Sequence, residues 1–128
     1  MTQSEVVTED PVDVLIVDDQ RPFRELARQV LLRRGYTVVG EAGCGATALD
    51  AAHRLQPDAV LLDVRLGFDC GFEVARELAR TCPQAAILLV SSEDYDHCRE
   101  RLRRSGARGF LLKSRLLSAE LAAFWPEP

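Results

Sequence analysis

The sequence VDVLIVDD at residues 12–19 decides the fold, because an apolar run of strand length, interrupted only at Asp13, ends there in two adjacent carboxylates. An apolar run without alternation is typical of a strand that is covered on both faces. Pro22 follows, and apolar residues then recur at helical spacing until Gly35, which predicts a helix between the proline and the glycine. A buried strand that leads directly into an amphipathic helix is the repeating unit of a parallel α/β sheet.

The same alternation continues along the rest of the chain. Four further apolar runs of strand length lie at 36–39, 59–62, 86–90 and 110–112. Apolar residues at helical spacing predict further helices at 48–55, 72–79, 94–104 and 118–125. The last of these would begin at Ser118 as its N-cap. Five strand–helix repeats predict one parallel sheet with right-handed crossovers and helices on both faces.

Length and composition fit one soluble domain with a single core. The chain has 128 residues, 47% hydrophobic and 28% charged, and no apolar stretch is long enough to span a membrane. The N-terminus lacks the basic and apolar regions of a signal peptide, so we expect a cytoplasmic protein with a disordered acidic tail at 1–10 and one domain at 11–128. The cysteine spacing matches neither a zinc site nor a disulfide scaffold, which predicts free thiols at Cys44, Cys70, Cys82 and Cys98.

Charge is distributed unevenly along the chain. The formal net charge is −4, yet residues 97–115 contain seven cations and one anion, so this basic region carries +6 and the remainder −10. We therefore expect one basic face on an acidic body. Fifteen of the 16 cationic residues are arginine, and Lys113 is the single lysine.

Polar side chains stand at the carboxyl ends of four of the five predicted strands. Two carboxylates end the first strand, one ends the third, a hydroxyl ends the fourth and an ammonium ends the fifth: Asp18, Asp19, Asp63, Ser91 and Lys113. Taken singly, each has an ordinary explanation as a helix cap, a turn residue or a surface cation. In a parallel sheet these ends share one edge, where ligands bind, so their coincidence predicts a common site.

The chemistry of that site follows from its atoms. Three carboxylates without a nearby histidine or cysteine favour a hard divalent cation, and Mg²⁺ accepts a few carboxylates while keeping several waters. Beside such a cation a carboxylate can attack a phosphoryl group, while a hydroxyl and an ammonium hold the phosphoryl oxygens. The compact charge of Lys113 suits this task better than the planar fork of an arginine.

Taken in order, these residues resemble the receiver domain of two-component response regulators over residues 12–125. The resemblance rests on the acidic pair, the single aspartate, a following glycine, the serine and the segment GARGFLLK: Asp18-Asp19, Asp63, Gly71, Ser91 and 106–113. It implies a flavodoxin-like (βα)5 fold with strand order 2-1-3-4-5, which would bring the first and third strands side by side.

The resemblance also implies a role for each site residue. Asp63 would accept the phosphoryl group, and Mg²⁺ would be bound by Asp18, Asp19, Asp63 and the backbone carbonyl of Arg65. Two further residues, Ser91 and Lys113, would hold the phosphoryl group, and the pair Ser91 and Phe110 would form the switch that moves on activation.

The sequence departs from the family pattern at three places. Gly67 stands where a proline is common, which predicts a more mobile loop. Cys70-Gly71 replaces a frequent Asp-Gly step. Lys113-Ser114 replaces a Lys-Pro step, which removes the usual reason for a cis peptide bond.

The function that the resemblance implies is a phosphorylation-controlled switch, which is not an enzyme with a separate substrate. A histidine kinase or phosphotransfer protein would supply the phosphoryl group, and partner binding would change through the face around residues 91–125. We expect a second copy or a downstream protein at the basic region 97–115, with no membrane contact. Only 15 residues follow Lys113, too few for a helix-turn-helix, so direct nucleic-acid binding by this chain is not expected.

Two alternatives stay open. The chain is an interaction module with a receiver fold that phosphorylation does not control, or it is the N-terminal receiver part of a longer DNA-binding transcriptional regulator. A further hypothesis concerns Arg65 and Glu93, which each lie two residues beyond a site residue. Neighbouring strand ends would set this cation and anion on opposite lips of the site, where they either pair or remain separately solvated.

Overall fold

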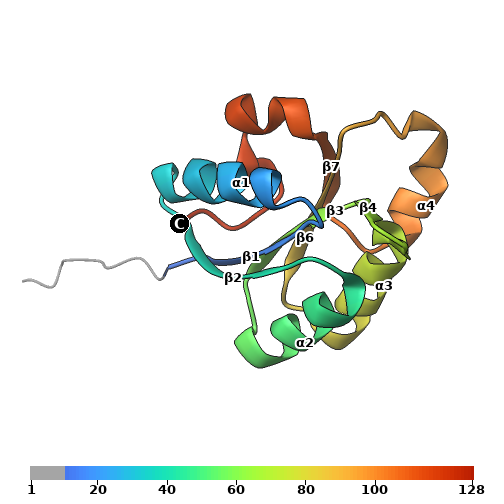
Figure 1. The fold of residues 1–128 in the computed structure, drawn as a ribbon, viewed down its shortest axis with the longest axis horizontal. Helices are drawn as coiled ribbons and strands as arrows, with labels where there is room; N and C mark the ends of the chain where they lie inside the picture. The colour runs from blue at the N-terminus through green and yellow to red at the C-terminus, as the bar shows by residue number, and fades with distance from the viewer. Residues whose placement is uncertain (1–10) are drawn as a thin grey trace, which may run out of the picture.

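The apolar runs form a five-stranded parallel sheet in the computed structural model, which describes residues 11–128 (Figure 1). Its strands are β1 (Asp13–Val17), β2 (Thr37–Ala42), β3 (Ala59–Asp63), β6 (Ala86–Ser91) and β7 (Gly109–Leu112). The order across the sheet is β2-β1-β3-β6-β7, with every neighbouring pair parallel. This is the predicted order 2-1-3-4-5, so the predicted flavodoxin-like fold is confirmed.

A small hairpin accounts for the two remaining strands. β4 (Arg65–Leu66) and β5 (Asp69–Cys70) pair antiparallel directly after β3. Gly67 has a φ of +64° at the first of the two turn positions. A positive φ there suits glycine, because a side chain would clash with the backbone. The loop that the sequence predicted to be mobile is thus an ordered turn in this structure, and its mobility stays a prediction.

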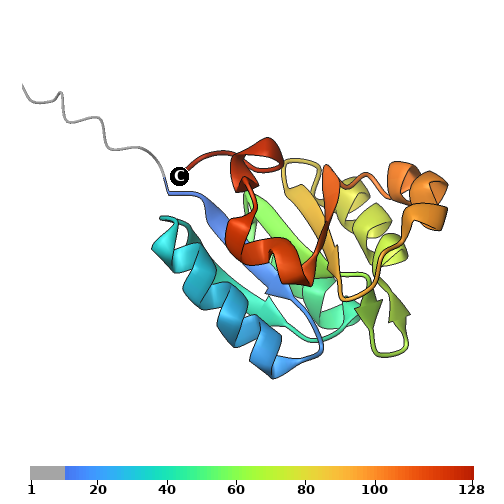
Figure 2. The same cartoon turned by 90° about the horizontal axis from the view of Figure 1, so that it is seen from above.

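Helices cover both faces of the sheet (Figures 1 and 2). One face packs against α1 (Arg21–Arg33) and the C-terminal segment, through a cluster that includes Leu31, Leu116 and Trp125. The other face packs against α2 (Gly45–Leu55) and α3 (Gly71–Thr81). Every residue of β3 and β6 is buried, as the unbroken apolar runs predicted.

The predicted helix at 118–125 is wrong. The segment forms two 3₁₀ turns, η2 (Lys113–Ser118) and η3 (Leu121–Ala123), and Ser118 ends the first of them instead of capping a helix. Arg34 donates hydrogen bonds to the carbonyls of Leu116, Leu117 and Ala119, which favours the break between the two turns. Two of the apolar residues that suggested a helix, Leu121 and Trp125, are still buried, and the Trp125 ring packs edge-on against another aromatic ring, that of Tyr36.

The predicted helix at 94–104 is shorter than expected. A 3₁₀ turn, η1 (Asp96–Cys98), leads into α4 (Arg99–Arg104), in which no residue is buried. The chain before it turns locally, because the Ser91 hydroxyl accepts a hydrogen bond from the Glu93 N–H. That α4 is the most loosely held helix stays a prediction.

Three other expectations concern the chain as a whole. All four cysteines are free, as predicted. Within residues 11–128, none of the helices has the length and apolar character that crossing a bilayer requires. The tail predicted at 1–10 lies outside the described residues.

Candidate functional site

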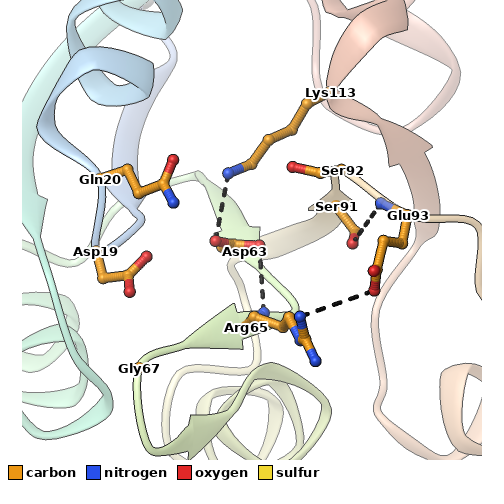
Figure 3. A pocket seen from close by; sticks show the side chains of 9 residues that line it. All are labelled: Asp19, Gln20, Asp63, Arg65, Gly67, Ser91, Ser92, Glu93 and Lys113. Carbon is orange, nitrogen blue, oxygen red and sulfur yellow. Dashed lines mark hydrogen bonds and ion pairs between the residues drawn. The ribbon is translucent and has the colours of Figure 1, made fainter.

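An open cleft of about 390 Å³ lies at the carboxyl edge of the sheet, where β1, β3, β6 and β7 end (Figure 3). Five of the residues that line it were predicted to belong to the site, and the full lining is Asp19, Gln20, Asp63, Arg65, Gly67, Ser91, Ser92, Glu93 and Lys113. The sheet register brings them together. Val17 pairs with Leu62, so the residues that follow, Asp18 and Asp63, are placed side by side.

The three predicted acidic residues form one cluster. Asp18 is fully buried, Asp63 is 5% exposed, and Asp19 is exposed at the rim. One carboxylate oxygen from each lies within 4.8 Å of the others. Like charges this close repel each other strongly where water is scarce, so the cluster requires a compensating cation or a bound proton.

The backbone holds one oxygen of each buried carboxylate. Asp18 Oδ1 accepts a hydrogen bond from the Gln20 N–H at 2.8 Å, and Asp63 Oδ1 accepts one from the Arg65 N–H at 3.2 Å. The second oxygen of each side chain faces Lys113 Nζ. The side chains are therefore oriented before any ligand arrives.

Lys113 supplies the compensating charge. Its Nζ lies 2.7 Å from Asp18 Oδ2 in an ion pair and 3.3 Å from Asp63 Oδ2, to which it donates a hydrogen bond. The lysine stands at the junction of β7 and η2, and its side chain is 12% exposed. The one lysine in an arginine-rich chain thus lies at the predicted place.

The buried position of Asp63 changes its acidity. Burial, followed by repulsion from Asp18, raises the pKa of Asp63 to about 6 from an ordinary value of 3.8. The Arg65 N–H and the ammonium of Lys113 act in the opposite direction. The Asp63 carboxylate is therefore ionised at neutral pH and protonated in mild acid.

The cluster fits a hard divalent cation. Asp18 Oδ2 is buried and, although it lies close to Lys113, receives no well-aligned hydrogen bond. The candidate ligands in the cluster are all carboxylate oxygens, the donor type that Mg²⁺ prefers. The fourth predicted ligand is the carbonyl of Arg65, a residue whose N–H already contacts Asp63. The residues therefore fit Mg²⁺, and the role of each stays a prediction.

The two switch residues occupy different surroundings. Ser91 is 2% exposed and lines the cleft from the end of β6. Phe110 does not line the cleft, and its partly buried ring packs edge-on against Tyr95, 6.1 Å between centroids. Tyr95 follows Ser91 by four residues, so the two predicted switch residues are connected through one short segment of chain.

The expected ion pair over the cleft is present. Arg65 Nη1 lies 3.9 Å from Glu93 Oε1, and both side chains are largely exposed. Figure 3 shows this pair to one side of Asp63, among the residues that line the cleft. The alternative that they never meet is wrong for this structure.

Two contacts of the site were missed at the level of sequence. Arg24 Nη1 donates a hydrogen bond to the Asp18 carbonyl at 2.6 Å, and its Nε pairs with Glu41 at 2.9 Å. Phe23 places its ring 4.3 Å from Lys113 Nζ, measured to the ring centroid. The contacts of Arg24 could have been suspected from Glu41, which lies near the carboxyl end of β2. Nothing in the sequence indicated the contact between Phe23 and Lys113.

The backbone of Gly71 lies very close to the backbone of Asp63, the candidate phosphoryl acceptor. Its N–H donates to the Val64 carbonyl at 2.7 Å, and a Cβ at this position would lie 2.2 Å from the Asp63 carbonyl oxygen. Only glycine allows α3 to start so near the end of β3.

The third departure from the family pattern is the step Lys113-Ser114. Its peptide bond is trans, since the described residues contain no cis peptide bond.

Comparison with known proteins gives a consistent result. The profile of the response regulator receiver domain family matches residues 14–122. The response regulator GacA of Pseudomonas aeruginosa is 36% identical over 103 residues, which cover 80% of this chain and 48% of GacA. The nitrate/nitrite response regulator protein NarP of Escherichia coli is 39% identical over 104 residues, covering 80% and 48%. The chain thus spans about half the length of these curated relatives.

Solved structures are similar over most of the chain. The signal receiver domain of NarL from Mycobacterium tuberculosis superposes with a TM-score of 0.79 at 34% identity, covering 89% of this chain and 96% of that one. A response regulator protein from Burkholderia pseudomallei gives 0.81 at 27% identity, covering 91% and 68%. That structure contains a phosphorylated aspartic acid and a calcium ion.

Proposed function

The chain belongs to the response regulator receiver domain family, and on this premise we propose that it is a signalling switch controlled by phosphorylation of Asp63. One observation carries the proposal. One oxygen of the Asp63 carboxylate is fixed by the Arg65 N–H, while the other lies 3.3 Å from the ammonium of Lys113 and faces an open cleft. This geometry presents an oriented nucleophile beside a cation.

The proposed reaction follows from these groups. Asp63 is ionised at neutral pH and attacks phosphorus; as the new oxygen–phosphorus bond forms, the bond between phosphorus and the donor breaks, and its electron pair leaves with the donor atom. Lys113 then turns from the carboxylate to a phosphoryl oxygen, and the Ser91 hydroxyl donates to another. Mg²⁺ held by Asp18, Asp19, Asp63 and the Arg65 carbonyl would neutralise charge on the phosphoryl oxygens.

We assign a histidine kinase or phosphotransfer protein as the donor, on the strength of family membership. The receiver would lie in the cytoplasm, consume no substrate other than its phosphoryl donor, and use Mg²⁺. Its output would be a change in partner binding on the face around residues 91–125, with a second copy or a downstream protein at the basic region 97–115. That this chain itself does not contact nucleic acid stays a prediction.

One alternative is supported by a specific finding. Relatives such as the transcriptional regulatory protein DegU of Brevibacillus brevis are about twice as long as the matched region, and 29% identical over it. A receiver followed by a DNA-binding part would give the same match. In either arrangement the receiver chemistry at Asp63 is the same.

The proposal is tested by intact-mass spectrometry. With acetyl phosphate and Mg²⁺ the wild-type chain should gain the mass of one phosphoryl group, and Asp63→Asn should gain none, because the amide is not a nucleophile. Asp50→Asn is the matched control, since Asp50 is an exposed residue of α2. A gain that persists in Asp63→Asn rejects the assignment of Asp63, and a wild-type chain that gains no mass rejects phosphorylation control.

We expect a phosphoryl mimic to shift an equilibrium in the segment 91–113. Drawing Ser91 toward the phosphoryl position would vacate space for Phe110, and Tyr95, which packs on Phe110, would move with it. Beryllofluoride with Mg²⁺ should therefore change amide hydrogen exchange across 91–113, while residues 45–55 of α2 serve as the internal control. Equal exchange in both states across 91–113 would contradict the switch.

The ion pair between Arg65 and Glu93 should lengthen the lifetime of the aspartyl phosphate. Hydrolysis needs a water aligned behind phosphorus, and the two side chains, which pair at the lining of the cleft, would cover that approach. We expect Arg65→Ala and Glu93→Ala each to speed dephosphorylation severalfold and the double variant to add little, because removing either partner opens the pair. Dephosphorylation rates are followed by mass, with Arg54→Ala as the control for loss of an exposed paired arginine. Wild-type rates in both single variants, or fully additive effects, would count against this role.

A further inference from the structure

The ammonium of Lys113 has a third neighbour besides the two carboxylates. The Phe23 ring lies beneath it, 4.3 Å from Nζ to the ring centroid. The two carboxylate oxygens lie 2.7 and 3.3 Å from the same atom. An aromatic face is negative at its centre and attracts a cation at this distance.

The fold fixes this ring independently of the lysine. Phe23 is the third residue of α1, just after Pro22, and its side chain packs against the apolar cluster between α1 and the sheet. Lys113 begins η2, which packs beside α1 (Figure 2). The ring and the ammonium therefore reach the cleft from two different elements that are packed together.

The ring face of Phe23 differs from a third carboxylate in how it attracts the ammonium of Lys113. It attracts the charge without occupying an N–H, because the contact is to the π system and not to a lone pair. The N–H groups of Lys113 consequently remain available for the carboxylate now and for a phosphoryl oxygen later. Such an attraction would also oppose a turn of the flexible side chain wholly toward Asp18, the nearer of its two anions.

We propose that Phe23 is a positioning residue of the phosphorylation site, which holds the Lys113 ammonium between Asp18 and Asp63 through its ring face. This inference rests on the proposed function, because the positioned group is the one that would receive the phosphoryl oxygens. A purely structural role for Phe23 would require only an apolar side chain of similar size. The two roles differ in whether the ring itself is needed.

Three substitutions separate these roles. Phe23→Leu keeps an apolar side chain but removes the ring face, whereas Phe23→Tyr keeps it. Leu26→Ala is the matched control, an apolar change at a half-exposed position on the same helix. Denaturant midpoints check that each variant is folded, and Phe23→Met replaces Phe23→Leu if the latter does not fold.

The first readout does not depend on phosphorylation. Because Lys113 is the only lysine in the chain, lysine-selective isotope labelling gives a single set of side-chain NMR signals. Ring-current shifts of its terminal methylene should be present in the wild type and in Phe23→Tyr, and lost in Phe23→Leu. Unchanged shifts in the folded Phe23→Leu or Phe23→Met variant would overturn the contact.

The second readout is the rate of phosphorylation by acetyl phosphate with Mg²⁺. We expect the rate to fall at least about threefold in Phe23→Leu and to be restored in Phe23→Tyr, the range that a cation–π contact at a partly buried site supports. A folded Phe23→Leu variant that reacts at the wild-type rate, or a Phe23→Tyr variant that is as slow as Phe23→Leu, would overturn the positioning role. A wild-type chain that is not phosphorylated at all instead rejects the proposed function, so the two failures are distinguishable.

Discussion

Replacing Asp63 with asparagine is expected to raise the free energy of unfolding of the metal-free protein at neutral pH, by up to about 3 kcal/mol. The pKa of Asp63 is raised to about 6 in the folded protein, against an ordinary value of 3.8. The folded state therefore binds the proton more tightly than the unfolded state. Ionisation of Asp63 costs stability, and an uncharged amide of the same shape avoids that cost, while Lys113 keeps its nearer partner, Asp18.

The pH dependence of the free energy of unfolding tests the predicted stabilisation by Asp63→Asn a second time. The stability cost begins above the unfolded pKa, near pH 4, grows as pH rises, and is complete above the folded pKa, near pH 6. Urea unfolding in a chelator should thus show wild type and Asp63→Asn converging in acid and separating by pH 7. Asp50→Asn, on an exposed side chain, should follow the wild type throughout. A variant that is less stable than wild type at pH 7, or a difference that does not change with pH, would contradict the raised pKa of Asp63.

A methyl group at Gly71 should be among the most destabilising single changes in the chain. A Cβ there would lie 2.2 Å from the Asp63 carbonyl oxygen, 2.6 Å from Val64 Cα and 2.8 Å from the Val64 carbonyl oxygen. All three are backbone atoms, which cannot turn aside as a side chain can. We expect Gly71→Ala to lower the free energy of unfolding by about 3 kcal/mol or more, the upper part of the range for overpacking.

Gly43→Ala is the matched control for this prediction. The nearest atoms to a Cβ at Gly43 lie 3.8 and 3.9 Å away, and its φ is not positive. Its denaturant midpoint should stay close to that of the wild type. Equal midpoints for Gly71→Ala and Gly43→Ala would show that α3 can move away from β3 at little cost, which would contradict the close approach.

The part of the site that could be predicted is the part that the sheet positions. A parallel register brings strand ends to one edge, so Asp18, Asp63, Ser91 and Lys113 could be grouped from apolar runs and the residues that end them. The Arg65–Glu93 pair followed from the same reasoning, because each residue lies a fixed two positions beyond a strand end. The order of the strands came from the family resemblance and not from periodicity.

The parts that could not be predicted depend on contacts between distant segments. Leu121 and Trp125 have helical spacing, but the hydrogen bonds of Arg34 to nearby carbonyls favour 3₁₀ turns instead. Tertiary contacts of this kind override local propensity. In the same way, the sequence shows Phe23 only as one more apolar position of α1. The packing of α1 against η2 is what brings the Phe23 ring to Lys113.

The phosphoryl acceptor can be identified directly at the level of the residue. Borohydride reduces an aspartyl phosphate to homoserine, so peptide sequencing by mass spectrometry after treatment with acetyl phosphate, Mg²⁺ and borohydride reports the modified position. We predict homoserine at position 63 alone, and none when Mg²⁺ is withheld by a chelator. Homoserine at Asp18, Asp19 or any other acidic residue in place of Asp63, or none at all with Mg²⁺ and acetyl phosphate present, would contradict the account.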